Sequence, residues 1–189
     1  MTGRGWITAA LLGVACLDAT GLSGQESVRA DPPRANRAVT DTGTIIYELV
    51  PNESDDVKAA IERSIQHMNF IVRPIARHRL TRTNHPPAHL TFANHTDTLV
   101  VTFEGANPIV TPRDGSLIPW VSGVSKEVYR VKAVVAGDTL HQTIVASDGH
   151  RVDDFIFSEG GERVRLDVRL FAERLPAPLM YSLSFRRVP

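Results

Sequence analysis

The sequence predicts a mostly β domain with one main helix (α+β), in which an antiparallel meander forms a curved sheet or a partly open barrel. Three observations support this class. A stretch of helical period precedes a long region in which apolar and polar residues alternate. Turn signals rich in Gly, Asp and Pro separate the alternating runs at short intervals. Connections this short cannot form parallel crossovers, so neighbouring strands are expected to run antiparallel.

The one predicted helix is amphipathic and covers residues 54–72. We expect Asn52 or Ser54 to cap its start and Pro74 to end or kink it. Its apolar residues recur at helical spacing and form one stripe: Val57, Ile61, Ile65, Met68 and Val72. Such a stripe has to be buried, so we expect this N-terminal helix to pack on the sheet.

The alternating region predicts about eight or nine strands, of which residues 162–172 form the clearest one. There Val164, Leu166, Val168 and Leu170 alternate with charged side chains. A run at 44–50 fits a short strand or an apolar strap. The other strands are predicted at 88–94, 98–103, 108–111, 117–121, 127–135, 139–146, 151–158 and 179–187. The apolar face of each long strand must be covered, by closure of the sheet and by the helix.

The first residues predict an exported protein. Arg4 precedes a short apolar run over residues 6–15, a pattern typical of a signal peptide and too short for a permanent membrane span. Residues 1–23 are therefore predicted to be a leader, residues 24–42 a polar linker and residues 43–189 a single domain. The expected location is the periplasm or cell envelope.

Cys16 indicates a second possible processing of the leader, as a lipoprotein. The residues before it resemble a lipobox, with the leader then ending at Ala15 and Cys16 carrying the lipid. Cleavage near Ser23 is the alternative, with Cys16 merely part of the leader. A lipid on Cys16 is the membrane anchor that the sequence predicts.

Composition excludes several function classes. The chain has 189 residues, with 21 basic and 21 acidic side chains, so its charge gives no reason to expect nucleic acid as a partner. Cys16 is the one cysteine. His85 and His89 have the spacing of two metal ligands, but Pro86 and Pro87 between them forbid that helix. We therefore expect no metal site, no cofactor and no catalytic residue.

Two sets of residues are candidates for binding. The first set consists of aromatic residues, which could line a ligand cavity or form plain core. These residues are Trp120, Tyr129, Phe155, Phe157 and Tyr181. The second set consists of arginines, and two interpretations fit it: a contact with anionic lipid headgroups or an anionic polymer, or a solvated helix end. These residues are Arg73, Arg77, Arg79 and Arg82.

Part of the sequence resembles a family of uncharacterised exported bacterial proteins whose β-meander looks lipocalin-like. The resemblance lies in residues 68–77, in residues 137–143 with Asp148, Gly149 and Phe155, and in residues 174–181. It covers roughly residues 52–187, and it implies a lipocalin-like fold and an envelope location. It implies no activity.

These observations favour a non-catalytic binding module for a small apolar or amphipathic ligand. The alternative is a structural or interaction (lipo)protein of the envelope that has no small-molecule ligand. An enzyme is the reading that the sequence supports least, because only its histidines point to one.

Overall fold

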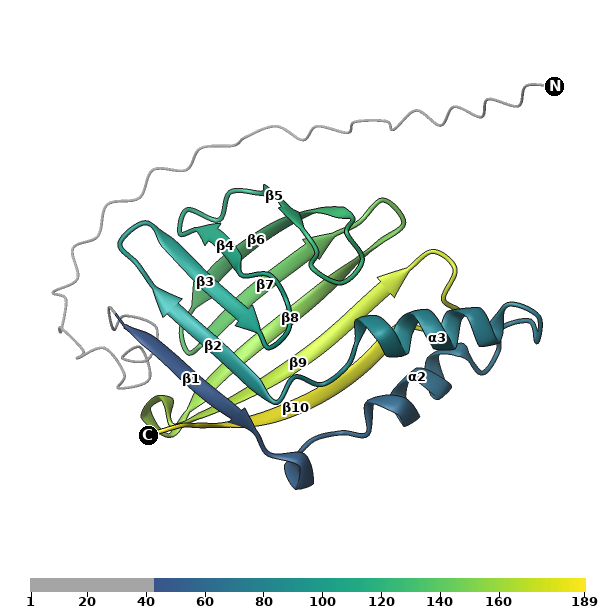
Figure 1. Cartoon of the computed structure of the whole chain (residues 1–189), viewed down its shortest axis with the longest axis horizontal. Coiled ribbons are helices and arrows are strands. Elements are labelled where there is room, and N and C mark those ends of the chain that lie inside the picture. The colour runs from purple at the N-terminus through teal and green to yellow at the C-terminus, as the bar shows by residue number, and fades with distance from the viewer. Residues whose placement is uncertain (1–42) are drawn as a thin grey trace, which may run out of the picture. The chain divides into compact units, whose positions relative to one another are not determined.

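A computed structural model describes residues 43–189 of the chain (Figure 1). The predicted leader, Cys16 and the predicted linker lie outside the described residues and stay predictions. None of the helices in the described part is both long enough and apolar enough to cross a membrane.

Ten strands form one sheet in which each strand runs antiparallel to its neighbours. The order β4-β3-β2-β1-β10-β9-β8-β7-β6-β5 is a meander with a single long connection, from β1 to β2. This confirms the predicted fold class, and the run at 44–50 is a strand. The strands are β1 (Thr44–Leu49), β2 (His89–Asn94), β3 (Thr98–Phe103), β4 (Ile109–Pro112), β5 (Ile118–Val121), β6 (Val128–Ala136), β7 (Thr139–Val145), β8 (Gly149–Ser158), β9 (Arg163–Ala172) and β10 (Leu179–Arg187).

The sheet curls until its two edge strands, β4 and β5, come close to each other (Figure 1). Two side chains bridge this seam. The indole nitrogen of Trp120 donates to the carbonyl of Pro108 at 3.0 Å, and the Asn107 amide donates to the carbonyl of Val121 at 3.2 Å. Side-chain bonds therefore replace a strand ladder at the seam, and the barrel is nearly closed.

The inner face of the barrel carries the core. Inward and outward residues alternate along the long strands, and most inward residues of β9 and β10 are buried, as their alternation predicts. Four aromatic rings meet edge to face at one end, with centroids 5.1–6.3 Å apart: Tyr47, Phe92, Phe155 and Phe157. Edge-to-face packing of this kind adds to the stabilisation from burial alone.

The predicted single helix is two helices, α2 (Val57–Ile65) and α3 (Arg73–Thr83). The prediction that Pro74 ends a helix was wrong, because Pro74 lies in the first turn of α3, where its missing N–H is not needed. The cap prediction was also wrong. The Asp56 carboxylate accepts the first free N–H groups of α2, whereas the Ser54 hydroxyl accepts from the Ser184 N–H of β10.

The two helices cover one end of the barrel. The buried stripe of α2 packs on β10, and the Arg77 guanidinium of α3 is bonded to Glu62 of α2 at 2.8 Å. On its other side α3 reaches the β5–β6 connection. There Arg82 donates to the carbonyl of Val124 at 3.4 Å, and Arg79 lies 3.7 Å from Glu127. The helix pair thus spans from β10 to the opposite wall.

Tyr47 makes the stability of this core sensitive to alkaline pH. Its hydroxyl donates to the carbonyl of Gly161 at 2.7 Å, and burial raises its pKa from 10.0 to about 12. The stabilisation is complete below pH 10, where Tyr47 is protonated in both states. As the pH rises from 10 to 12, only the unfolded state loses its proton, so stability falls by about 2–3 kcal/mol.

We expect Tyr47→Phe to flatten this alkaline loss while it lowers stability at pH 7 by about 1 kcal/mol, since the bond to Gly161 is lost. Urea unfolding at pH 7, 9, 10 and 11 measures both effects. An equal alkaline loss in the variant would show that another group is responsible.

Candidate functional site

Five polar side chains interrupt the apolar inner face and form what we call the inner polar cluster. They come from the end of α3 and from strands β7, β8 and β10: Asn84, Gln142, Arg151, Asp153 and Tyr181. Gln142 and Asp153 face each other directly across β7 and β8. Polar groups inside a β-barrel are costly unless they are paired, so each one needs an explanation.

A buried ion pair forms the middle of the cluster. The Nε of Arg151 lies 2.7 Å from Oδ1 of Asp153, which is fully buried. Burial raises the pKa of the Asp153 carboxyl, and the neighbouring guanidinium only partly opposes this. Burial is also the largest influence on Arg151 and disfavours its charge, but Asp153 and Tyr181 together outweigh it, and the pKa of Arg151 lies above its ordinary value. The 2.7 Å contact joins a guanidinium to a carboxylate, so the bonded pair carries no net charge inside the barrel.

Asn84 and Tyr181 close the cluster on the side of the helices. The Asn84 side-chain oxygen accepts from the Tyr181 hydroxyl at 3.3 Å and from Nη1 of Arg151 at 3.4 Å. Its amide nitrogen donates to the carbonyl of Leu80 in the last turn of α3, at 3.0 Å. Asn84 thus caps α3 and ties the helix to the interior of the barrel.

Gln142 is the exception in this network. It is fully buried, yet neither its amide nitrogen nor its amide oxygen has a hydrogen-bond partner among the described residues. The Oδ2 atom of Asp153, on the strand opposite, also has none. One donor and two acceptors are therefore left over side by side, which is the hydrogen-bonding complement of a hydroxyl or an amide group.

The aromatic residues predicted to bind a ligand all lie on the inner face, but they do not form one group. Phe155 and Phe157 belong to the buried aromatic end of the core. Tyr181 belongs to the inner polar cluster. Trp120 and Tyr129 form a separate pair near the seam, with centroids 6.0 Å apart. Whether these residues bind a ligand stays a prediction.

The inner face beside the cluster is less tightly covered than the aromatic end. Arg151 lies 5.8 Å from the centroid of the Phe103 ring and contacts it as a cation over a π face. Several apolar side chains that point inward here keep part of their surface accessible: Phe103, Trp120, Tyr129, Ile144 and Leu170. An amphipathic molecule would find both apolar contacts and free polar groups in this region.

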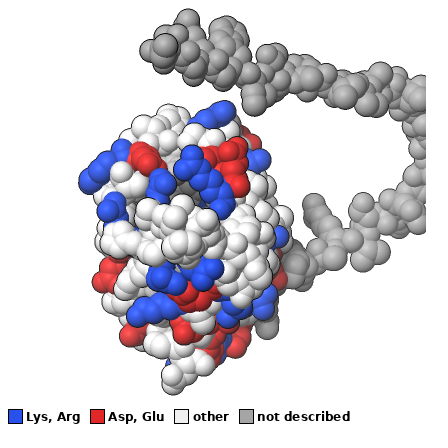
Figure 2. Space-filling view, turned by 90° about the vertical axis from the view of Figure 1, so that its right-hand side faces the viewer, with Lys and Arg blue, Asp and Glu red and all other residues white. Residues whose placement is uncertain are grey.

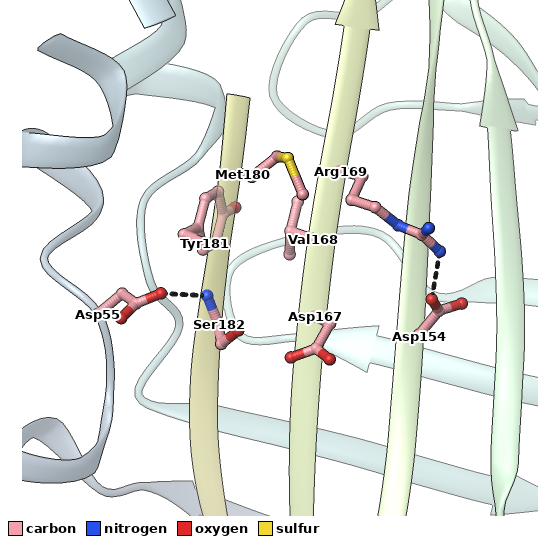
Figure 3. Close-up of a pocket in the computed structure, with 8 residues that line it drawn as sticks. All are labelled: Asp55, Asp154, Asp167, Val168, Arg169, Met180, Tyr181 and Ser182. Carbon is pink, nitrogen blue, oxygen red and sulfur yellow. Dashed lines mark hydrogen bonds and ion pairs between the residues drawn. The ribbon is translucent and has the colours of Figure 1, made fainter. Parts of the chain in front are cut away.

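A hollow lies on the outer face of β8, β9 and β10, with a volume of about 350 Å³ (Figure 3). Asp154 and Asp167 face each other across its floor. Asp154 is bonded to His141 at 2.7 Å and to Arg169, whereas Asp167 is bonded to Arg165 at 2.9 Å. Each carboxylate has an ion-pair partner, although Oδ1 of Asp167 is buried without a hydrogen-bond partner among the described residues. One unpaired atom remains here against three in the inner polar cluster, so the outer hollow is the weaker candidate.

No group of three or more His, Cys, Asp or Glu side chains within residues 43–189 is arranged to hold a metal ion. His89 lies 3.4 Å from Glu104 on the neighbouring strand, and His141 is bonded to Asp154. Adjacent residues Asp153 and Asp154 point to opposite faces of β8, the first inward and the second outward, so they cannot act together.

The four arginines predicted as an anionic-surface contact all belong to α3, not to the C-terminal end of the first helix. Arg73 donates to the carbonyls of Gln66 and Met68 at 2.7 and 2.8 Å, and therefore holds the α2–α3 connection. Arg77, Arg79 and Arg82 make the helix contacts described above. A binding role of this set stays a prediction.

Four of the five residues of the inner polar cluster were not predicted as binding residues, although three of them occupy recognisable positions in the sequence pattern. Gln142 occupies an inward position between Leu140 and Ile144 in β7. Arg151 and Asp153 occupy the inward positions that precede Phe155 in β8. A polar residue in the apolar register of a predicted strand is therefore the pattern that would have found three members.

No protein-family model and no curated protein sequence matches the chain. Solved structures of lipid-binding proteins are similar at low identity. A Schistosoma mansoni fatty acid binding protein in complex with arachidonic acid has 12% identity over 80% of this chain and 99% of its own, with a TM-score of 0.49. Echinococcus granulosus fatty-acid-binding protein 1 has 10% identity over 78% of this chain and 96% of its own, with a TM-score of 0.48. Human cRBP IV has 13% identity over 78% of this chain and 97% of its own, with a TM-score of 0.46. All three TM-scores lie below 0.5, so the fold assignment rests on the strand pairing of this chain.

The buried ion pair predicts a contrast between single and double substitution. We expect Asp153→Ala to lower the free energy of unfolding by about 3–5 kcal/mol, because it leaves the Arg151 charge buried and uncompensated. The double variant Arg151→Met with Asp153→Leu removes both charges and should be as stable as the parent or more stable. Urea unfolding of the three proteins at pH 7 measures this. A double variant that loses as much as the single one would contradict it.

Proposed function

We propose that the protein is a non-catalytic binding module whose nearly closed barrel takes up a small amphipathic molecule. The observation that carries this proposal is Gln142, a fully buried amide with no partner for either of its polar atoms among the described residues. Leaving such a group unpaired costs about 1–3 kcal/mol. A ligand that bonds to Gln142 recovers this free energy, which gives the residue a reason to be there.

The charges of the cluster indicate the chemistry of the ligand. Asp153 already compensates the Arg151 guanidinium, so the interior offers no net positive charge to a carboxylate. The unpaired atoms are the donor and the acceptor of Gln142 and one carboxylate oxygen of Asp153. A neutral group that both donates and accepts, a hydroxyl or a primary or secondary amide, satisfies this set.

The surroundings indicate a ligand of modest length. Phe103 and Ile144 flank the cluster and keep part of their surface accessible, which suits a short apolar body. At the other end the interlocked rings of Phe92, Phe155 and Phe157 leave the core packed. The proposed ligand therefore lies under α3, with its polar end at Gln142 and its apolar part toward the seam.

The compartment is part of the proposal and rests on the N-terminal sequence. A basic residue followed by the short apolar run at 6–15 supports export to the periplasm or cell envelope. Anchoring through Cys16 is the further element that awaits a test. Palmitate labelling that disappears in Cys16→Ser would support it, and labelling that survives this substitution would refute it.

Binding of matched probes tests the ligand chemistry. We expect a fluorescent fatty alcohol of medium chain length to bind at least about tenfold more tightly than the fatty acid with the same chain, since an unpaired buried carboxylate is costly. Fluorescence titration at pH 7.5 measures both dissociation constants. Tighter binding of the acid would contradict the assignment of a neutral head.

Gln142→Leu separates binding from stability. This nearly isosteric change removes the unpaired amide, so we expect the free protein to gain about 1–2 kcal/mol and the fatty alcohol to bind at least about tenfold more weakly. Thr143→Val is the matched control, because it removes a hydroxyl from the next residue, which faces the other side of β7. Unchanged alcohol binding by Gln142→Leu would refute the site.

A further inference from the structure

The connection between α2 and α3 exposes large apolar side chains at one end of the molecule. Phe70 is 77% exposed, Ile71 65% and Ile75 67%, and neighbouring Val72 is 43% exposed. No residue of α3 is fully buried. Isolated apolar residues on a surface are ordinary, but a contiguous set of four marks a contact surface. We call residues 70–75 the apolar tip.

The apolar tip is held in one conformation by its own hydrogen bonds. The Asn69 side chain accepts from the Ile71 N–H at 2.9 Å, and the Asn69 carbonyl accepts from the N–H groups of Val72 and Arg73 at 3.1 and 3.0 Å. Arg73 then donates to two carbonyls on the α2 side of the connection. These bonds present the apolar side chains to solvent instead of letting them fold back onto the barrel.

Positive charge surrounds the tip. Between residues 57 and 84 the chain carries six Lys and Arg side chains and one acidic side chain, Glu62, although the whole chain has no net charge. Figure 2, which looks onto this end of the molecule, shows an uncharged protrusion with Lys and Arg side chains above and below it and Asp and Glu side chains among them. Glu62 is bonded to Arg77, and Glu127 from the β5–β6 connection lies 3.7 Å from Arg79. The other four cations of this segment form no salt bridge within residues 43–189: Lys58, Arg63, Arg73 and Arg82.

We infer that the apolar tip docks on an anionic lipid bilayer, with Phe70, Ile71 and Ile75 in the interface and the α3 arginines at the headgroup phosphates. Apolar side chains with a ring of cations are the composition that binds such a surface, where burial and charge attraction add. Four side chains are far fewer than the roughly 20–30 residues on each side of a stable protein–protein interface. A convex tip of this size suits the soft lipid interface.

Local labelling tests this inference without interference from other membrane-seeking segments. Cys16 is the one cysteine, so Cys16→Ser provides a thiol-free full-length chain. A spin label is attached at Ile71→Cys, and a matched label at Ile46→Cys, which is 44% exposed on β1. Power saturation with oxygen and with a water-soluble nickel chelate then reports the depth of each label in phosphatidylglycerol–phosphatidylcholine vesicles.

We expect the label at position 71 to become at least about fivefold less accessible to nickel and more accessible to oxygen in these vesicles, and the label at position 46 to stay in water. Association of the chain with vesicles while position 71 stays in water would overturn the inference, because another segment would then be the anchor. Equal shielding of both labels would overturn it as well.

Charge substitution tests the second part of the inference. Arg79→Gln with Arg82→Gln should weaken binding to the anionic vesicles about 10- to 30-fold, as two charges near the surface imply. The control, Arg165→Gln with Arg186→Gln, removes two charges from the barrel wall and should change binding by less than about threefold. An equal loss in both variants, or strong binding to pure phosphatidylcholine by either, would show that the α3 arginines do not guide docking.

Discussion

One constraint shapes the whole molecule: the apolar face of a ten-stranded sheet has to be buried, and two short helices cannot cover it. The helices contain 9 and 11 residues, and only α2 has fully buried side chains. The sheet therefore covers itself by curling, as antiparallel meanders with a right-handed twist do. Closure is completed by side chains such as Trp120 at the seam, where β4 and β5 form no ladder with each other.

Curling creates an interior, and the interior is where the chain departs from what stability alone favours. Apolar residues in place of the Arg151–Asp153 pair would avoid the cost of burying two charges. Gln142 is buried next to this pair without a partner among the described residues. Departures from a consistent core are expected at functional sites, since binding can offset their cost. The inner polar cluster is the place where function best explains the residues that are present.

Helix α3 connects the two surfaces that we assign. Its first turn carries the apolar tip, whereas Asn84 at its other end bonds to Tyr181 and Arg151 inside the barrel. Ala76 and Leu80 of α3 are partly buried against the core, although no residue of the helix is fully buried. The same helix therefore links the apolar tip to the residues that border the inner polar cluster.

Much of this fold follows from local patterns, and the failures have clear physical reasons. Alternation fixes the faces of strands such as β9, where Val164, Leu166, Val168 and Leu170 point inward as expected. The prediction that Pro74 ends or kinks the helix failed because proline is tolerated both in the first turn of a helix and beyond its last turn. A single sequence does not distinguish these two positions. The extent of closure depends on how all ten strands stagger, which no local pattern encodes.

The candidate site was harder to predict from the sequence than the fold. The five aromatic residues were predicted to line a cavity or to form plain core, and their division into a packed end and a pair at the seam depends on the curvature of the sheet. Gln142 and Asp153 become neighbours only through the register of β7 on β8. They stand out as a candidate site because their side-chain atoms lack hydrogen-bond partners among the described residues, and this can be seen only when the surrounding side chains are in place.

Native mass spectrometry of the full chain, purified from its own cells without detergent, tests the central claim most directly. The account predicts one small neutral molecule bound per chain in the parent protein, carrying a hydroxyl or an amide, and its loss from Gln142→Leu. A parent spectrum that contains only the mass of the bare chain, under conditions that preserve a known barrel–ligand complex, would contradict it.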